Sequence, residues 1–488
     1  MAWTTISRLV QQVLQFGSSI VLARLLLPSD YGLIAVVGSV MVFAQLFTDL
    51  GLGAAIIHRD IPTPSFLSTV FWVNAVTGVG LSLLSGALGY LLAFIYGEHQ
   101  LRDLMWIGGL TFALDVRIVH TSLLERTMRF RQLALVETAS TFIGIATSTT
   151  AAAVFHAGAT SLVLGPVFAT VAASLLLWLT VPWRPSLTAT RQDASATIRF
   201  GRGLLGFNIL TYWSRNADNV LLAGVTSATQ LGLYSRAYAL MMGPLTQVSN
   251  VFGRVLFPIF TRSRDNPREV GRLWLRSTKL IFLTTAPIAL LLSTAAPAAI
   301  ATFYGPHWRG AAIMLELLAA AATLQLLPVA SGQVYYAFGA TDELFRRGLV
   351  SSTCTVVAIG AGLPWGAVGV AAGILVNTLL MSWYPVAGVC RLTEMRLADA
   401  LASLKGLLLS AVAFAAVSIA VRLLLTAVVP DAVLLLLQGA AGFVAMLVAL
   451  SVLDHLLFDD ARRYAIRFGK RLLGAISGGR RKPRSPSR

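Results

Sequence analysis

Long apolar runs joined by short connections limit what this chain can fold into more than any other feature of its sequence. A helix of about 20 apolar residues crosses a bilayer core, and we count about fourteen such runs. Their centres lie near Val13, Met41, Leu81, Phe112, Thr147, Ala169, Tyr212, Gln247, Pro287, Ala321, Val356, Leu375, Val412 and Met446. Because 56% of the 488 residues are hydrophobic and only 12% are charged, the sequence predicts an all-α integral membrane protein.

Basic residues indicate which side of the membrane each connection faces. They gather on alternate connections, and the other connections hold little beyond Arg24, Arg102, Arg309 and Arg422. The basic set contains Arg126, Arg129, Arg131, Arg184, Arg191, Arg199, Arg202, Arg262, Arg264, Arg268, Arg272, Arg276, Lys279, Arg346, Arg347, Arg391, Arg396 and Lys405. The positive-inside rule makes this set cytoplasmic. With an even number of spans, both termini are then expected in the cytoplasm.

The net charge of +17 does not indicate nucleic acid as a partner. Most of it lies on the cytoplasmic connections and on the carboxy-terminal tail. Basic residues near anionic inner-leaflet lipids contribute about 1 kcal/mol each. We therefore assign this charge to topology and to contact with membrane lipids.

The sequence lacks the usual signals of an enzyme. No connection is long enough for a catalytic domain, and neither a nucleophile motif nor a Gly-rich phosphate loop is present. The two cysteines, Cys354 and Cys390, show no metal-ligand spacing. We therefore expect no catalytic residue, no metal and no cofactor.

Two parts of the chain come into register and indicate an internal repeat. Residues 21–57 align with residues 221–257, so that Gly32 falls on Gly232. In both copies a short polar loop ends in Gly-Leu and opens a long helix. Two lobes of about six helices around a midplane cavity are a common architecture of secondary transporters.

The repeat suggests how the chain is divided. We expect two lobes related by the repeat, then two further helices, and finally a basic cytoplasmic tail. The expected boundaries are residues 1–190, 191–395, 396–457 and 458–488.

One face of the expected seventh span is polar along its length. At about 100° per residue, Asn208, Tyr212, Arg215 and Asn219 lie within one wedge. Asp218, three positions after Arg215, partly neutralises it. An ionised side chain near a bilayer centre costs roughly 2.5–3.5 kcal/mol. We expect this face either to line a cavity or to form a structural salt bridge between helices.

The expected eighth span also carries its polar residues on one face. Arg236, Gly243, Gln247, Asn250 and Arg254 share it, and neither arginine has an acidic residue three or four positions away. The helical rise separates the two arginines by about 27 Å. They therefore either mark the two mouths of a route or extend to the membrane surfaces.

Carboxylates inside the spans are candidates for ion coupling. Asp115 and Arg117 lie on the expected fourth span and point to different faces of a regular helix, so they are not expected to pair locally. Asp49 lies near the end of the second span and Glu316 in the tenth. A carboxyl group within a membrane protein can carry a proton. We take Asp115, Glu316 and Asp49 as coupling candidates and Arg117 as a substrate-binding candidate.

Several short motifs occur in a specific order. The first set is LLLPSDYGL at 25–33, TDLGLG at 48–53, RTMRFR at 126–131 and WRP at 183–185. The second set is RNADN at 215–219, LGLYSRAY at 231–238 and RVLFP at 254–258. Together they resemble the polysaccharide-transporter family of the multidrug/oligosaccharidyl-lipid/polysaccharide exporter superfamily.

This resemblance implies a flippase of the bacterial inner membrane. Such a protein moves a polyprenyl-diphosphate-linked oligosaccharide, a unit of O-antigen, capsule or exopolysaccharide, to the periplasmic leaflet by alternating access. It implies Arg215 as the first contact of the diphosphate or acidic sugars, with Arg236, Asn250 and Arg254 along the path. Asn208 and Asn219 would bind sugar hydroxyls, with Asp218 beside them. The last two spans would guide the lipid tail.

The resemblance also suggests partners and alternatives. A polysaccharide polymerase and a chain-length regulator are expected neighbours of a monomeric protein. Related drug exporters couple to sodium or protons through carboxylates in the first lobe, of which this chain has few. A cation-coupled drug or metabolite antiporter is therefore the second hypothesis. A non-transporting subunit of a glycan assembly complex is the third.

Overall fold

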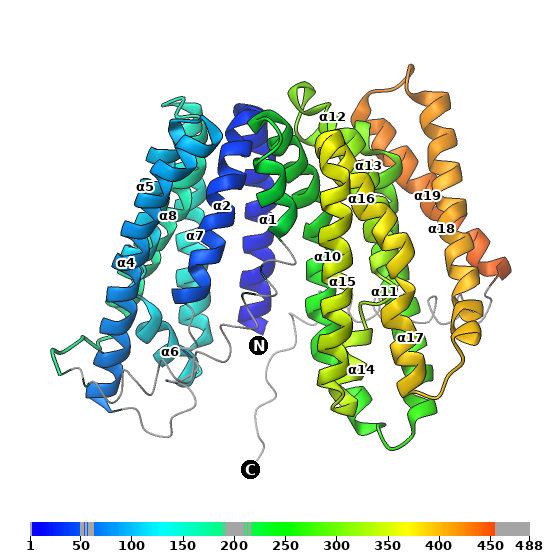
Figure 1. Ribbon diagram of the computed structural model, residues 1–488, viewed down its shortest axis with the longest axis horizontal. Helices are drawn as coiled ribbons and strands as arrows, with labels where there is room; N and C mark the ends of the chain where they lie inside the picture. Colours follow the sequence, from blue (N-terminus) through cyan, green and yellow to red (C-terminus); the bar gives the residue numbers. More distant parts are fainter. Residues whose placement is uncertain are drawn as a thin grey trace, which may run out of the picture. The chain divides into compact units, whose positions relative to one another are not determined.

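The computed structural model describes residues 2–48, 63–188 and 216–453, together with residues 53, 56, 190, 209 and 212. All regular elements of this part are helical (Figure 1). They are α1 (Ala2–Leu25), α2 (Pro28–Thr48), α4 (Pro64–Tyr96), α5 (Gln100–Leu114), α6 (Ile118–Arg126), α7 (Phe130–Ala153), α8 (Ala159–Thr180), α10 (Ala228–Arg262), α11 (Pro267–Thr294), α12 (Ala296–Phe303), α13 (Ala311–Gln325), α14 (Ser331–Phe338), α15 (Thr341–Gly362), α16 (Gly366–Met381), α17 (Trp383–Leu392), α18 (Leu397–Leu425) and α19 (Asp431–Leu453). The predicted all-α class is confirmed.

Many of these helices are long and apolar enough to cross a membrane. Within the described part there are seven such spans, namely α2, α4, α8, α11, the run Thr341–Leu392, α18 and α19. An eighth is added if α5 and α6, bent by 45° at a short break, form one span. The chain is therefore a multi-pass membrane protein, and its total of fourteen spans remains a prediction.

Capping residues define where the long helices begin and end. The Thr63 hydroxyl accepts a hydrogen bond from the Phe66 amide at 3.3 Å, and Pro64 opens α4. Proline suits this position because the first amides of a helix have no partner within it. At the other end, Gly97 adopts φ 69°, a conformation that glycine reaches without a steric penalty. Between these caps the helix is apolar over most of its length, as expected in lipid.

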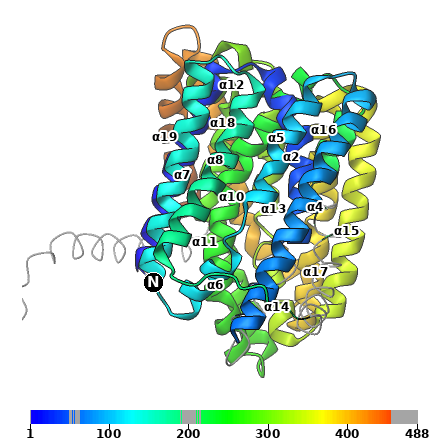
Figure 2. The same ribbon diagram turned by 90° about the vertical axis from the view of Figure 1, so that its left-hand side faces the viewer.

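The Cα positions divide the chain into two compact units. The first comprises Met1–Tyr238, Ile300–Met314 and Ser352–Ile374, and the second comprises Ala239–Ala299, Leu315–Ser351 and Leu375–Arg488. In the first unit α4 packs on α5, α7 packs on α8, and α5 joins the two pairs through α8 (Figure 2). In the second unit α18 packs on α19, and α11 lies against both. The lobe boundaries expected from the repeat stay a prediction.

Two glycines allow a close backbone approach within the first unit. A Cβ atom at Gly32 would clash with the backbone of Ala228, and a Cβ atom at Gly232 would clash with that of Pro28. Glycine is needed at both positions because the obstructing atoms belong to backbone and cannot rotate away. The contact is reciprocal between positions that the sequence aligned, since Gly32 corresponds to Gly232 and Pro28 to Ala228.

Candidate functional site

A polar cavity of about 620 Å³ lies within the first unit, beside the break between α5 and α6. Side chains of α2, α4, α6, α7 and α8 line it together with residues of the break. They are Gln45, Thr48, Gly53, Asn74, Asp115, Arg117, Ile118, Thr121, Ser122, Glu125, Leu133, Val136, Glu137, Ala173 and Leu177. The predicted candidates Asp115 and Arg117 thus share one cavity.

The break brings Asp115 and Arg117 together. The Arg117 Nε donates a hydrogen bond to the Asp115 Oδ1 at 2.9 Å. The expectation that these side chains would not pair locally is wrong. It assumed a regular helix, whereas Asp115 has φ −82° and ψ 72°, outside the helical region.

Neighbouring helices supply hydrogen bonds to the carbonyl groups that the break exposes. The Asn74 Nδ2 of α4 donates to the Asp115 carbonyl at 2.7 Å, and the Ser174 hydroxyl of α8 donates to the Leu114 carbonyl at 2.9 Å. The Trp178 Nε1 lies 3.5 Å from the Val116 carbonyl. A buried carbonyl without a partner would be costly. These side chains therefore stabilise the interruption in the span.

The cavity carries more negative than positive charge. Its ionisable residues are Asp115, Glu125, Glu137 and Arg117. Glu125 on α6 and Glu137 on α7 lie close enough to repel each other. Within the described part of the chain, neither of these two side chains has a hydrogen bond or an ion pair. The cavity therefore has two carboxylates available to a cation, a proton or the hydroxyl and amino groups of a ligand.

Sequence reasoning missed most of the cavity lining. Glu125 stands at the end of the short helix α6, beside the basic residue Arg126, and no sequence pattern singled it out. Asn74 lies in the otherwise apolar α4 and is only 5% exposed. The sequence predictions included Asp115 and Arg117 of this lining, and a lone amide in an apolar span is a signal that could have added Asn74.

Arg236 lies apart from this cavity, beside Tyr31. Its guanidinium carbon is 4.4 Å from the centroid of the Tyr31 ring, which is a cation–π contact. The Arg236 Nε and the Tyr31 hydroxyl are both buried without a hydrogen-bond partner in the described residues. The Tyr31 ring meets Trp308 edge-on at 5.2 Å, and the Trp308 Nε1 donates to the Ala23 carbonyl at 2.7 Å. Arg236 is thus half-buried, held by an aromatic ring, and has donor capacity to spare.

Asp218 and Asn219 connect the expected seventh span to α10. Asp218 is 4% exposed, and its Oδ2 accepts a hydrogen bond from the Tyr234 hydroxyl at 2.8 Å. Its Oδ1 accepts from the Asn219 amide at 2.8 Å. The Asn219 side-chain oxygen is buried without a partner among the described residues. Asp218 therefore holds two helices together, while Asn219 keeps an acceptor available.

Several predicted site residues lie outside the described part of the chain. Asp49, Asn208 and Arg215 are among them. Asn250 and Arg254 lie on α10, but their side chains are outside the described residues.

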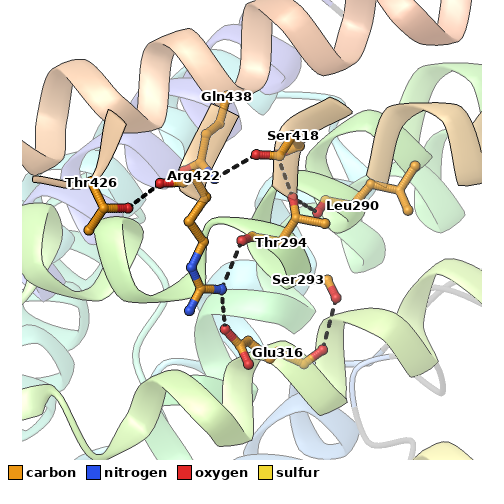
Figure 3. Close-up of polar contacts among 8 residues, drawn as sticks. All are labelled: Leu290, Ser293, Thr294, Glu316, Ser418, Arg422, Thr426 and Gln438. Atoms are coloured by element: carbon orange, nitrogen blue, oxygen red, sulfur yellow. Dashed lines mark hydrogen bonds and ion pairs between the residues drawn. The ribbon is translucent and has the colours of Figure 1, made fainter. Parts of the chain in front are cut away.

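Glu316 lies in the second unit and is paired. Its Oε1 accepts a hydrogen bond from the Arg422 guanidinium of α18 at 2.7 Å (Figure 3). Among the described residues, no group of three or more His, Cys, Asp or Glu side chains could hold a metal ion.

A comparison with protein families shows to which family this membrane protein belongs. Residues 21–313, more than half of the chain, match the model of a family described as polysaccharide biosynthesis protein. The chain belongs to this family. The resemblance to polysaccharide transporters is thereby confirmed.

Two relatives and one solved structure are similar to this chain over most of its length. The teichuronic acid biosynthesis protein TuaB of Bacillus subtilis (strain 168) is 27% identical over 347 residues, which cover 70% of this chain and 71% of TuaB. The succinoglycan biosynthesis transport protein ExoT of Rhizobium meliloti (strain 1021) is 26% identical over 452 residues, or 90% and 89% of the two chains. The structure of the lipid II flippase MurJ, in an inward closed conformation, superposes with a TM-score of 0.73 at 14% identity and covers 93% of this chain and 98% of MurJ. This chain and MurJ share a fold.

Proposed function

We propose that this chain is a flippase that moves a polyprenyl-diphosphate-linked oligosaccharide across the bacterial inner membrane by alternating access. The observation that carries the proposal is a polar cavity of about 620 Å³ among the membrane helices of a polysaccharide biosynthesis protein. Its volume falls within the roughly 300–1,000 Å³ of small-ligand sites. Its carboxylates, amides and hydroxyls match the donors and acceptors of a sugar.

The relatives support a saccharide as cargo. TuaB and ExoT take their names from two different polysaccharides, and ExoT is described as a transport protein. MurJ is described as a flippase of a lipid-linked substrate and has the same fold. Transport requires a route for a polar group through apolar helices, and the α5–α6 cavity supplies part of one. We propose no catalytic step.

The cargo has three chemically distinct parts, and each requires its own surface. For the sugars we propose the cavity with Asp115, Arg117, Glu125 and Glu137. For the diphosphate we propose Arg236, whose guanidinium lacks a carboxylate partner among the described residues. The path expected from the sequence, with Arg215, Arg254, Asn208, Asn219 and Asn250, is part of this proposal. Cation–π stacking orients Arg236 without neutralising it, so its charge remains available to a phosphate.

For the lipid tail we propose a groove along α18 and α19. It measures about 650 Å³ and is lined only by alanine and valine. The residues are Ala413, Val417, Ala440, Ala441, Val444, Ala445, Val448 and Ala449. Small side chains leave room for a methyl-branched prenyl chain, which packs by van der Waals contact in a lipid environment.

We also propose the finer architecture expected from the sequence. It comprises about fourteen spans in two lobes of about six helices, residues 1–190 and 191–395, with both termini in the cytoplasm. Two findings support the repeat. One is the reciprocal contact of Gly32 and Gly232. The other is the shared pattern of α5–α6 and α13–α14, in which a 15-residue helix is followed by a break and a helix of 9 or 8 residues. A polymerase, a chain-length regulator and a monomeric state are part of this proposal.

The charge of the cavity favours a second candidate function. Three carboxylates against one guanidinium suit a cation better than an anion. A cation-coupled drug or metabolite antiporter would use the same residues, with Glu125 and Glu137 as the coupling pair.

Reconstitution separates the two functions. The purified chain would be placed in vesicles with a fluorescent polyprenyl-diphosphate oligosaccharide, and its passage between leaflets followed with an impermeant quencher. We expect flipping above that of protein-free vesicles, and loss of flipping in Glu137→Gln. Vesicles that expel a small organic cation along a proton or sodium gradient, without moving the lipid, would favour the antiporter.

A further inference from the structure

A polar network connects four helices of the second unit (Figure 3). The Arg422 guanidinium of α18 donates to the Glu316 carboxylate of α13 at 2.7 Å and to the Thr294 carbonyl of α11 at 3.3 Å. The Thr294 and Ser418 hydroxyls are 2.8 Å apart, which joins α11 to α18 a second time. The Gln438 Nε2 of α19 donates to the Ser418 carbonyl at 3.1 Å. We call these five residues the polar latch.

The neutral residues of the latch are buried, whereas its two charged residues are partly exposed. Ser418 and Gln438 are 0% exposed and Thr294 is 6% exposed. The Arg422 and Glu316 side chains are 35% and 26% exposed. Arg422 stands in the last turn of α18 and faces the last carbonyls of α11. A cation is favourable at both helix C-termini because of the helix dipole.

The helix pair α18–α19 presents two surfaces. On α19 the buried stripe is Leu434, Gln438, Gly442, Met446 and Leu450. The proposed tail groove occupies the neighbouring face, which begins at Ala440. On α18 the adjacent residues Val417 and Ser418 divide the two roles, since Val417 lines the groove and Ser418 belongs to the latch. The latch and the groove are thus parts of the same two helices.

Apolar contacts alone define the position of a membrane helix poorly. Lipid tails are as apolar as the helix surface, so there is no hydrophobic gain on association. Hydrogen bonds and ion pairs select one register, because a shift of one turn would leave them unmade. Two helices that together form a groove for a long tail need such a register if the groove is to keep its shape.

We infer that the polar latch positions α18 and α19 on α11 and α13, and thereby sets the tail groove for the long prenyl chain. Glu316 and Arg422 act as positioning residues, and Glu316 is not a coupling carboxylate. This inference rests on the proposed function for the identity of the tail. The register of the helices follows from the latch contacts and does not depend on the proposed function.

Two measurements test the latch separately. The first compares flipping of substrates that share a head group and carry a long or a short prenyl tail. The second is a cross-link that reports register, formed between Leu291→Cys and Gly439→Cys after replacement of Cys354 and Cys390 by alanine. The pair is suitable because a Cβ atom at Gly439 would lie 3.2 Å from the Leu291 Cδ2.

We expect Arg422→Gln to slow long-tail flipping about tenfold, the equivalent of ~1.4 kcal/mol, and to slow cross-linking likewise. Short-tail flipping should stay within about twofold, because a short tail makes less contact with the groove. Arg422→Lys keeps a cation at both helix C-termini and should retain both readouts better than Arg422→Gln. Gln438→Leu keeps the buried shape and should fold, yet it should slow cross-linking because α19 loses its bond to α18.

The control is Arg268→Gln. Arg268 on the first turn of α11 pairs with Glu394 at 3.6 Å, but both side chains are exposed, at 78% and 62%. It should leave both readouts unchanged. Equal loss for long and short tails, or an unchanged cross-link in Arg422→Gln and Gln438→Leu, would overturn the inference. A wild-type chain that flips neither substrate would overturn the proposed function, while the cross-link would still test the latch.

Discussion

Two of the carboxylate–arginine pairs among the described residues, Asp115–Arg117 and Glu316–Arg422, have different surroundings. Asp115 and Arg117 are 2.9 Å apart and line a cavity that contains two further carboxylates without partners. Glu316 and Arg422 are 2.7 Å apart and belong to a network in which Thr294 and Ser418 make further hydrogen bonds. The distance within each pair is almost the same. The Asp115–Arg117 pair differs because additional negative charge and an open cavity lie beside it.

This difference separates function from structure in a membrane protein. Ionised groups among apolar helices are expensive and persist when they pair or serve a ligand. The latch leaves little charge without compensation, so it is understood as a structural device. The cavity keeps Glu125 and Glu137 free of partners in the described part of the chain, and folding alone gives no reason for them.

The largest expected effect is on transport through the cavity. We expect the double variant Glu125→Gln with Glu137→Gln to lose about a hundredfold in flipping rate, at ~1.4 kcal/mol for each of two important contacts. Its thermal stability in detergent should not fall, because the amides remove a repulsion between carboxylates. A parallel loss of stability and transport would show that the cavity carboxylates are structural, and the contrast with the latch would fail.

The two arginines provide a matched pair of variants. Arg422→Gln removes the guanidinium's hydrogen bonds to Glu316 and to the Thr294 carbonyl, and should lower the free energy of unfolding by about 2 kcal/mol. Arg117→Gln removes a single hydrogen bond, to Asp115, and should lower it by less than about 1 kcal/mol. Its main effect should be on flipping. Chemical denaturation in detergent measures both, and a reversed order would contradict the assignment of roles.

Asn74 tests whether the break at 115–117 is needed for the cavity. Asn74→Ala removes the donor to the Asp115 carbonyl and should cost about 1–3 kcal/mol, the penalty of a buried acceptor without a partner. We expect a smaller loss of flipping than in the glutamate double variant, measured in the same vesicles. Full activity together with full stability would mean that the carbonyl finds water and that the break persists without Asn74.

The smallest effect is expected at an exposed pair. Arg268→Gln breaks the contact with Glu394 at the start of α11 and should change the free energy of unfolding by less than about 0.5 kcal/mol. Flipping should be unchanged. A large effect there would show that the contrast between buried and exposed pairs does not hold in this protein.

Sequence patterns predicted the polar residues of the site better than their grouping. Asp115 and Arg117 were identified as charged residues inside a span, and both line the cavity. Their pairing was excluded on helical geometry, which does not apply once the helix is interrupted. Arg236 has no acidic residue one helical turn away, and in the structure its guanidinium lies over the ring of Tyr31. Tyr31, which it contacts, lies about 200 positions earlier in the sequence, so no helical pattern could predict this contact.

The amino-acid sequence by itself determined that this is an all-helical membrane protein of the polysaccharide biosynthesis family. Apolar runs of about 20 residues predict helices that cross the membrane, because a helix satisfies all of its backbone hydrogen bonds within one segment in lipid. Only the tertiary structure decided which charges are free and which are satisfied. Glu316 meets Arg422 across 106 positions, and the bend at Asp115 depends on donors from α4 and α8. Such contacts arise from how helices pack, and a local pattern contains no information about the partner.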